Sequence, residues 1–199
     1  MKKVITTEKK PIKLWLEDID EAALQQARNL ANLPITYKWV AIMPDCHKGF
    51  GMPIGGVQAT EDVIIPNAVG VDIGCGMCAV KTSLKSINKR DLTNIVNQIN
   101  HSIPKGSKHH KNRQKWEGFD TAPAVDIIQQ ELDNARYQLG TLGGGNHFIE
   151  IQKGSDGHIW LMLHSGSRNF GLKIANTFHK KAVKYCDDKN IELPNKSLA

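Results

Sequence analysis

The chain has 199 residues, of which 40% are hydrophobic and 23% are charged, and its formal net charge is +6. This composition is typical of globular proteins, and no apolar run reaches the roughly 20 residues that a membrane helix needs. The opening MKKVITTEKKPIK has lysines but no apolar stretch behind them, so a signal peptide is not predicted. The positive charge favours polyanions as partners.

The cysteine content points to a reducing compartment. Four cysteines in 199 residues, without the density or spacing of a small disulfide scaffold, are typical of intracellular proteins. The sequence therefore predicts a cytoplasmic protein with no membrane association.

Predicted helices and strands are interspersed along the chain. Apolar spacing and turn residues predict a helix over 20–33 with Asp20 as N-cap and Pro34 as its stop, a strand over 35–43, an irregular segment over 44–56, strands over 63–65 and 71–84 around a turn at 66–67, helices through 92–99 and 128–139, a hairpin of strands 148–152 and 158–164, and a final helix over 172–185. Thr121 and Pro123 suit the start of the helix through 128–139. No regular βαβ rhythm is present, so we expect an α+β fold with mixed and antiparallel sheets and surrounding helices.

The stretch Val71-Asp72-Ile73-Gly74-Cys75-Gly76-Met77-Cys78 is a candidate binding segment. In a regular strand Asp72 and Cys75 would face opposite ways. Glycine inside a strand pattern often marks a bulge or bend, and a bend here would bring the carboxylate and the thiol to one centre. The alternative is a core strand in which the cysteines are small hydrophobes.

Cys75 and Cys78 also form a C-x-x-C pair, which occurs in redox and zinc sites. The chain has no second such pair, so a metal site here needs other kinds of ligand.

Two histidines border the predicted hairpin and can supply the other metal ligands. If residue 152 pairs with 159 across a six-residue loop, His147 lies directly opposite His164, and both project from the same face. A five-residue loop would place them on opposite faces, so the register tests the idea. Each histidine taken alone favours the alternative of a satisfied side chain at a strand end, whereas the pairing of the two beside glycine-rich loops favours a metal site.

Two loops and one basic run are candidate phosphate contacts. The loops 143–146 and 165–168 are rich in glycine or serine, and successive backbone amides in such turns can hold an anion, although a plain turn is the alternative. No Lys-Ser/Thr follows the glycines, so this is not a Walker A loop. The run 105–115 carries Lys105, Lys108, Lys111, Arg113 and Lys115 with His109 and His110, and it is either a nucleic-acid contact or merely a solvated surface.

Four motifs together resemble the RtcB family of GTP- and manganese-dependent ligases, which join RNA ends in tRNA splicing and RNA repair. They are Met43-Pro44-Asp45-Cys46-His47-Lys48-Gly49, Ala68-Val69-Gly70-Val71-Asp72-Ile73-Gly74-Cys75-Gly76, Leu142-Gly143-Gly144-Gly145-Asn146-His147-Phe148-Ile149-Glu150 and His164-Ser165-Gly166-Ser167-Arg168. The resemblance covers nearly the whole chain and implies that residues 1–199 are the amino-terminal portion of an RtcB-like catalytic domain.

The resemblance implies a role for particular residues. Asp72, Cys75, His147 and His164 fall on ligands of two manganese ions, with the Cys75 thiolate as the bridge. Asp72 and His147 would serve one ion and His164 the other. Cys78 has no place in the family pattern and is interpreted as structural.

Further residues fall on substrate contacts. Residues Asn146, His147, Phe148, Ile149 and Glu150 fall on the guanine-nucleotide segment, so GTP is the expected cofactor beside manganese. Asp45, His47 and Arg168 lie in the other motifs and are candidates for RNA or phosphate binding, as are Lys105, Lys108, Lys111 and Arg113 of the basic run.

The implied reaction joins an RNA 3′-phosphate or 2′,3′-cyclic phosphate to a 5′-hydroxyl through a guanylylated histidine. That histidine and a third metal-binding histidine are expected in the half that this chain lacks, so we expect the chain alone not to complete ligation. RNA is the expected partner, with an archease-like activator as a further one. Two alternatives are a metal-dependent phosphoesterase acting on RNA ends and a non-catalytic RNA-binding fragment.

Overall fold

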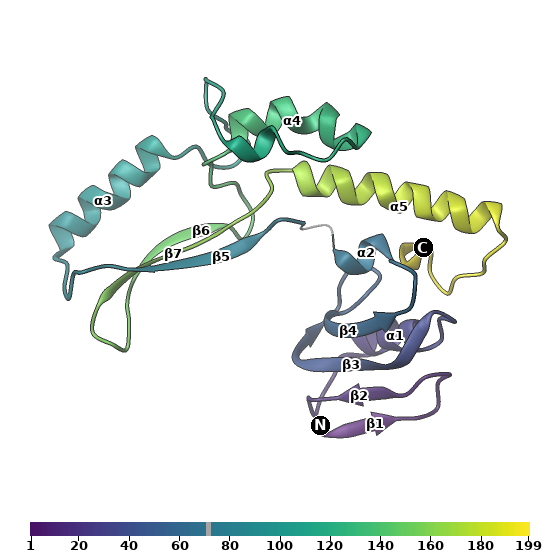
Figure 1. Cartoon of the computed structure of the whole chain (residues 1–199). Helices are drawn as coiled ribbons and strands as arrows, with labels where there is room; N and C mark the ends of the chain where they lie inside the picture. Colours follow the sequence, from purple (N-terminus) through teal and green to yellow (C-terminus); the bar gives the residue numbers. More distant parts are fainter. Residues whose placement is uncertain (71–72) are drawn as a thin grey trace. The chain divides into compact units, whose positions relative to one another are not determined.

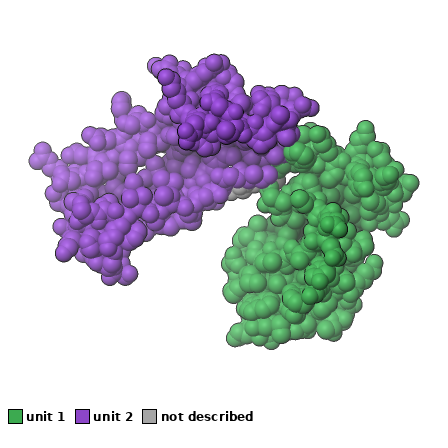
Figure 2. All heavy atoms as spheres, in the orientation of Figure 1, with its two compact units in different colours: residues 1–71, 175–199 green, residues 72–174 purple. Residues whose placement is uncertain are grey.

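A computed structural model describes residues 1–70 and 73–199. The chain forms two compact units, shown in green and purple in Figure 2. Unit 1 comprises residues 1–71 and 175–199, and unit 2 comprises residues 72–174. The expected α+β fold is confirmed, because helices are interspersed with one mixed and one antiparallel sheet (Figure 1).

Unit 1 is built on a four-stranded mixed sheet. Its strands are β1 (Lys3–Ile5), β2 (Ile12–Leu14), β3 (Thr36–His47) and β4 (Ile54–Thr60), in the order β1-β2-β3-β4. β2 and β3 run parallel because α1 (Glu21–Ala31) crosses between them, and the other pairs are antiparallel. The short α2 (Pro66–Val69), the part of α5 (Phe170–Asp188) from residue 175 onward and the 3₁₀ turn η2 (Lys196–Leu198) complete the unit.

Helix α1 follows its sequence pattern closely. The Asp20 side chain accepts hydrogen bonds from the backbone N–H groups of Ala22 and Ala23, so it caps the helix as predicted. The apolar stripe of this helix packs into a core that includes Ile12, Leu14, Ala27, Leu30, Leu33, Val40, Ile42, Ile65 and Leu198. Unit 1 therefore has a closed hydrophobic interior.

Unit 2 is built on an antiparallel sheet of three strands. Its strands are β5 (Gly76–Lys81), β6 (Phe148–Lys153) and β7 (Ile159–Ser165), with β7 in the centre. Its helices are α3 (Lys89–Ser102) and α4 (Asp126–Gln138), with the 3₁₀ turn η1 (Glu117–Phe119), and α5 (Phe170–Asp188) begins in this unit. β6 and β7 form the predicted hairpin.

Several predicted elements differ from the structure. Residues 63–65 form no strand, because Ile65 is the N-cap of α2. Residues 44–56, expected to be irregular, contain the end of β3 and the start of β4, while β1 and β2 were not predicted. Helix α4 begins after Val125 and without a side-chain cap, so Thr121 and Pro123 do not mark its start.

No helix in the described residues is both long enough and apolar enough to cross a bilayer.

Candidate metal centre

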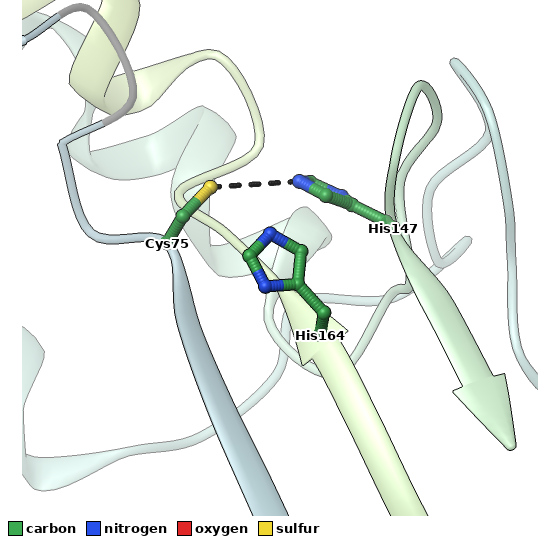
Figure 3. A group of neighbouring side chains, drawn as sticks. All are labelled: Cys75, His147 and His164. Atoms are coloured by element: carbon green, nitrogen blue, oxygen red, sulfur yellow. Dashed lines mark hydrogen bonds between the residues drawn. The ribbon is translucent and has the colours of Figure 1, made fainter. Parts of the chain in front are cut away.

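Three side chains of unit 2 converge at one end of its sheet. Cys75 immediately precedes β5, His147 immediately precedes β6, and His164 lies near the end of β7. Figure 3 shows the thiol and the two imidazole rings directed toward one another. One ligand atom from each of the three lies within 4.8 Å of the others, and all three residues are half-buried. They form a potential metal site.

The hydrogen bonds of His147 direct one nitrogen toward this centre. Its Nδ1 lies 2.8 Å from the carbonyl oxygen of Leu142. Because a carbonyl only accepts, Nδ1 carries the proton in the neutral ring, and the lone pair is on Nε2. Nε2 lies 3.5 Å from Cys75 Sγ. A second-shell carbonyl that fixes the tautomer in this way is typical of metal-binding histidines.

His164 contributes a buried nitrogen with unused bonding capacity. Its Nε2 is buried and has no hydrogen-bond partner among the described residues. An unsatisfied buried polar atom is costly, so such an atom in a native structure calls for a ligand or an ion. The ring of Phe148 stacks on that of His164 with centroids 6.0 Å apart, and the His147 and His164 centroids are 5.4 Å apart.

The spacing fits a metal ion coordinated by nitrogen and sulfur. A thiolate about 2.3 Å and an imidazole about 2.1 Å from a tetrahedral ion lie roughly 3.6 Å apart, close to the 3.5 Å between Cys75 and His147. One thiolate and two imidazoles suit several transition metals, and the donor set alone does not select manganese, because the affinity of such sites generally follows the Irving–Williams order.

The predicted hairpin register is wrong, although the two histidines do meet. Gln152 pairs with Trp160 and Phe148 pairs with His164, so the loop has five residues, 154–158. Phe148, not His147, therefore lies opposite His164. His147 precedes β6 in the glycine-rich turn, so strand alternation does not govern its direction, and the turn brings its ring to the site.

Two glycines permit this close arrangement. A Cβ on Gly166 would lie within 3.0 Å of Cys75 Sγ and 3.2 Å from His147 Nε2. A Cβ on Gly143 would lie within 3.0 Å of both His147 Nδ1 and an Arg168 guanidinium nitrogen, and the φ of Gly143 is +97°. The glycine-rich loops thus allow the imidazole to approach the backbone closely. This role is separate from the anion binding predicted for the same loops.

The predicted bend before β5 is present. Residues 73–74 form a turn, Gly74 has a φ of +87°, and β5 begins at Gly76. Asp72, the predicted carboxylate ligand, lies outside the described residues. Cys78 is exposed on β5, three residues after Cys75.

The predicted nucleotide segment divides between two faces of the sheet. Phe148 lies beside His164, whereas Ile149 pairs with Leu163 and lines a cavity on the opposite face. Asn146 and Glu150 are exposed, and Glu150 accepts a hydrogen bond from Gln152. Of the five residues 146–150, His147 and Phe148 adjoin the candidate metal centre.

Arg168 braces the loops around the centre. Its Nε donates to Thr141 Oγ1 at 2.8 Å, and another guanidinium nitrogen donates to the Gly106 carbonyl. The residue itself has a φ of +57°. For its predicted role in phosphate binding, Arg168 would use the guanidinium N–H groups that do not take part in these two hydrogen bonds.

The basic run 105–115 is exposed but partly engaged with its neighbours. Lys105 donates to Asn100, and Arg113 forms an ion pair with Asp133 on α4 at 2.7 Å. That hydrogen bond and charge raise the pKa of Arg113 above its ordinary value. Lys108 and Lys111 are exposed, and neither forms an ion pair within the described residues. These two lysines are the more accessible candidates for phosphate.

Asp45 and His47 belong to unit 1. They lie near the end of β3, where His47 Nδ1 is 2.9 Å from the Asp45 carbonyl. Burial raises the pKa of the Cys46 thiol between them, and Asp20 and Asp45 raise it further. A raised pKa disfavours the thiolate, so Cys46 is not a strong nucleophile candidate.

Sequence reasoning missed the polar frame that holds the centre. Ser165 Oγ donates to the Leu142 carbonyl at 2.8 Å, so this oxygen accepts from both Ser165 and His147. The hydroxyl of Thr141 donates to Gln138 and accepts from Arg168. Every residue has a backbone carbonyl, so the sequence does not indicate the role of the Leu142 carbonyl. Ser165, in contrast, belongs to the motif His164-Ser165-Gly166-Ser167-Arg168, which could have indicated its role.

Comparison with known proteins agrees with the motifs. A sequence profile described as tRNA-splicing ligase RtcB matches residues 26–124 and 117–199. The RNA-splicing ligase RtcB of Escherichia coli K12 is 37% identical over 98% of this chain and 53% of its own length. The tRNA-splicing ligases RtcB of Methanococcus maripaludis and Pyrobaculum aerophilum are 30% and 28% identical, over 94% and 96% of this chain and 49% and 51% of their own.

The chain belongs to the RtcB family of tRNA-splicing ligases. It spans about half the length of the curated relatives it matches.

Proposed function

We propose that this chain supplies the amino-terminal half of an RNA ligase and carries part of its metal and guanine-nucleotide site. The ligase would join RNA 3′-phosphate or 2′,3′-cyclic phosphate ends to 5′-hydroxyl ends, in tRNA splicing or RNA repair. The proposal rests on the convergence of Cys75, His147 and His164. These residues belong to three of the four family motifs, and they meet at one point.

Each residue of the centre has a definite task in this proposal. Cys75 and His147 would bind one of two manganese ions together with Asp72, and His164 would bind the other, with the Cys75 thiolate shared between them. The Leu142 carbonyl holds His147 in the tautomer that leaves Nε2 available. Divalent ions bound there would stabilise the negative charge that develops on phosphoryl oxygens during transfer.

The surroundings would orient the nucleotide and the RNA. Residues 146–150 would contact GTP, with Phe148 beside the metal centre and Asn146 and Glu150 exposed to solvent. Arg168 would act through its remaining donors and through its hold on the loops. The exposed Lys108 and Lys111 would neutralise RNA phosphates.

Two further expectations belong to the proposal. Guanylylation and the remaining metal ligand would come from a histidine-bearing segment outside this chain, so the isolated chain would bind metal without completing ligation. We place the protein in the cytoplasm with RNA as its partner, and an archease-like activator as a second one.

Metal titration and labelling with GTP test the proposal together. Cobalt, a spectroscopic probe for the site, should produce a thiolate-to-cobalt absorption band, and Cys75→Ser should abolish it. Failure of the wild-type chain to give the band would refute the metal site. With labelled GTP and manganese, the isolated chain should form no covalent guanylate, and a stable adduct would contradict the division of labour proposed here. Opening of a cyclic-phosphate RNA without GTP would favour a phosphoesterase instead.

A further inference from the structure

The four-stranded sheet of unit 1 has one covered face and one open face. Helix α1 packs against the covered face (Figure 1), whose strand residues in the core are Ile12, Leu14, Val40 and Ile42. Side chains alternate along a strand, so Lys13 and Ala41 project from the opposite, open face. Val4 pairs with Lys13 and Val57 pairs with Ala41, so both belong to the open face, where Val4 is 39% and Val57 is 53% exposed.

Two exposed aromatic rings on β3 each lie beside a lysine. Trp39 is 41% exposed, and the ammonium of Lys13 lies 3.4 Å from the centroid of its indole ring, which places this ring on the open face. Tyr37 is 45% exposed, and the ammonium of Lys38 lies 4.9 Å from its ring centroid. A cation over an aromatic ring is a weak interaction at an exposed site, so each lysine can exchange the ring for a stronger partner.

The strands of this sheet carry more positive than negative charge. All four lie within the described residues 1–70, and their lysines are Lys3, Lys13 and Lys38, whereas Asp45, near the end of β3, is their only acidic residue. Neither Lys13 nor Lys38 forms an ion pair within the described residues. The two lysines beside the rings are therefore available to an anionic partner.

Exposed rings beside such lysines suit single-stranded nucleic acid better than protein. Unpaired bases stack on aromatic side chains while lysines bind the phosphates between them, and a four-stranded sheet with aromatic rings on its face is a common platform for this purpose. A duplex hides the faces of its bases. A protein partner would have to bury Lys13 together with the indole ring, and lysine is depleted from the cores of protein interfaces.

We propose that the open face of unit 1 binds unpaired nucleotides of the RNA substrate, with one base stacked on Trp39 and a second on Tyr37. Lys13 and Lys38 bind the adjoining phosphates, and the flexible stem of Lys13 lets its ammonium move from the ring to a phosphate. This surface shares no residue with the candidate metal centre or the basic run, which belong to unit 2. The choice of RNA rests on the proposed function, whereas the stacking surface does not depend on it.

Fluorescence anisotropy with the 199-residue chain tests this surface. The probe is a short fluorescein-labelled RNA without internal pairing, and duplex RNA of the same length serves for comparison. Trp39→Ala should weaken binding of the single strand about 10-fold, because stacking on an aromatic ring contributes on the order of this factor per base. Trp39→Phe retains a stacking ring and should retain most of the affinity. Binding of the duplex should not depend on Trp39.

Tyr185→Ala is the matched control. Tyr185 is 60% exposed on the part of α5 that belongs to unit 1, outside the sheet, so its loss should leave binding of the single strand unchanged. Lys13→Gln should lower the slope of log affinity against log salt by about 0.7, the value for one phosphate contact on a single strand.

Photo-crosslinking of the wild-type chain to RNA that contains 4-thiouridine keeps the test valid if Trp39→Ala fails to fold. Adducts should map to residues 37–39 of β3. Four results would overturn the inference: no binding of the single strand, wild-type affinity in folded Trp39→Ala, an equal loss in Tyr185→Ala, or adducts confined to unit 2. Wild-type affinity in a Trp39→Ala variant that has lost self-association would assign the open face to a second copy of the chain instead.

The same titrations separate this surface from the proposed chemistry. They are performed in EDTA and repeated in Cys75→Ser and in the double variant Lys108→Gln, Lys111→Gln, where the fold-loss caused by Trp39→Ala should be unchanged. Dependence on Trp39 without a cobalt band in the metal titration would count against the metal centre alone. A cobalt band without dependence on Trp39 would count against the open face alone.

Discussion

Replacing Gly166 with alanine should disable the candidate metal centre while leaving the fold of unit 2 in place. The added Cβ would lie within 3.0 Å of Cys75 Sγ and 3.2 Å from His147 Nε2. Non-bonded heavy atoms are comfortable at roughly 3.5 Å or more, so the thiol must move by at least about 0.5 Å. Metal sites and catalytic sites tolerate displacements of only about that size.

The expected cost is a 10- to 100-fold loss of metal affinity, or about 1.4 to 2.8 kcal/mol of binding free energy. The assay is a cobalt titration followed by the thiolate-to-cobalt absorption band, repeated with manganese by calorimetry. The band should weaken or shift, because the displaced atom is the sulfur itself.

Gly76→Ala is the matched control. Gly76 pairs with Ser165, the residue before Gly166, and a Cβ on it would meet nothing within 4 Å. This variant should bind metal like the wild-type chain. Wild-type affinity in Gly166→Ala, or an equal loss in both variants, would show that the centre does not depend on the close approach seen here.

Three further predictions concern other parts of the molecule. Ser165→Ala removes a hydrogen bond to the carbonyl that orients His147, so metal affinity should fall about 10-fold; histidine ¹⁵N NMR of the metal-free chain should show a mixed tautomer for His147, and an unchanged spectrum would sink this account. Lys81 lies 2.7 Å from Asp156, and the hydrogen bond from Lys81 is the largest of the effects that hold the pKa of Asp156 well below its ordinary range. A carboxyl group with a depressed pKa stabilises the fold above its unfolded-state pKa of about 4, and this stabilisation is lost as the pH falls below that value. The free energy of unfolding should therefore decrease less steeply below pH 4 in Asp156→Asn than in the wild-type chain. Identical pH profiles of the two proteins would contradict this. Asp20→Ala removes the cap of α1 and should lower the free energy of unfolding in urea by about 1 kcal/mol, and a loss near zero would argue that the cap is dispensable.

Features that depend on neighbouring residues were predictable from the sequence. The α1 stripe, its Asp20 cap and the hairpin 148–165 all follow from local spacing and were found within a few residues of their expected bounds. Strand β4 was missed because Gly55 and Gly56 were assigned to the irregular segment over 44–56. Both glycines fit into β4, because Gly55 adopts a φ of +73°, which glycine readily accommodates, and because the long β3 supplies the pairing partner.

Three of the four predicted metal ligands, Cys75, His147 and His164, come together in the structure, but the predicted hairpin geometry that was to bring them together was partly wrong. The hairpin register was one residue off, and a strict strand would then have separated His147 from His164. The turn before β6 brings His147 back to the centre, and its direction depends on the Leu142 carbonyl, which is a tertiary contact. Hydrophobic alternation and motif spacing contain no information about such a contact.

The discontinuity of unit 1 has a consequence for synthesis on the ribosome. Its interior is formed by residues 1–71 together with the returning segment 175–199, in which Leu198 is 1% exposed. The intervening 72–174 must be translated before that side chain can reach the core. The first segment of unit 1 thus emerges with an apolar gap that stays open through about a hundred further codons, whereas unit 2 is contiguous in sequence and can begin to fold meanwhile.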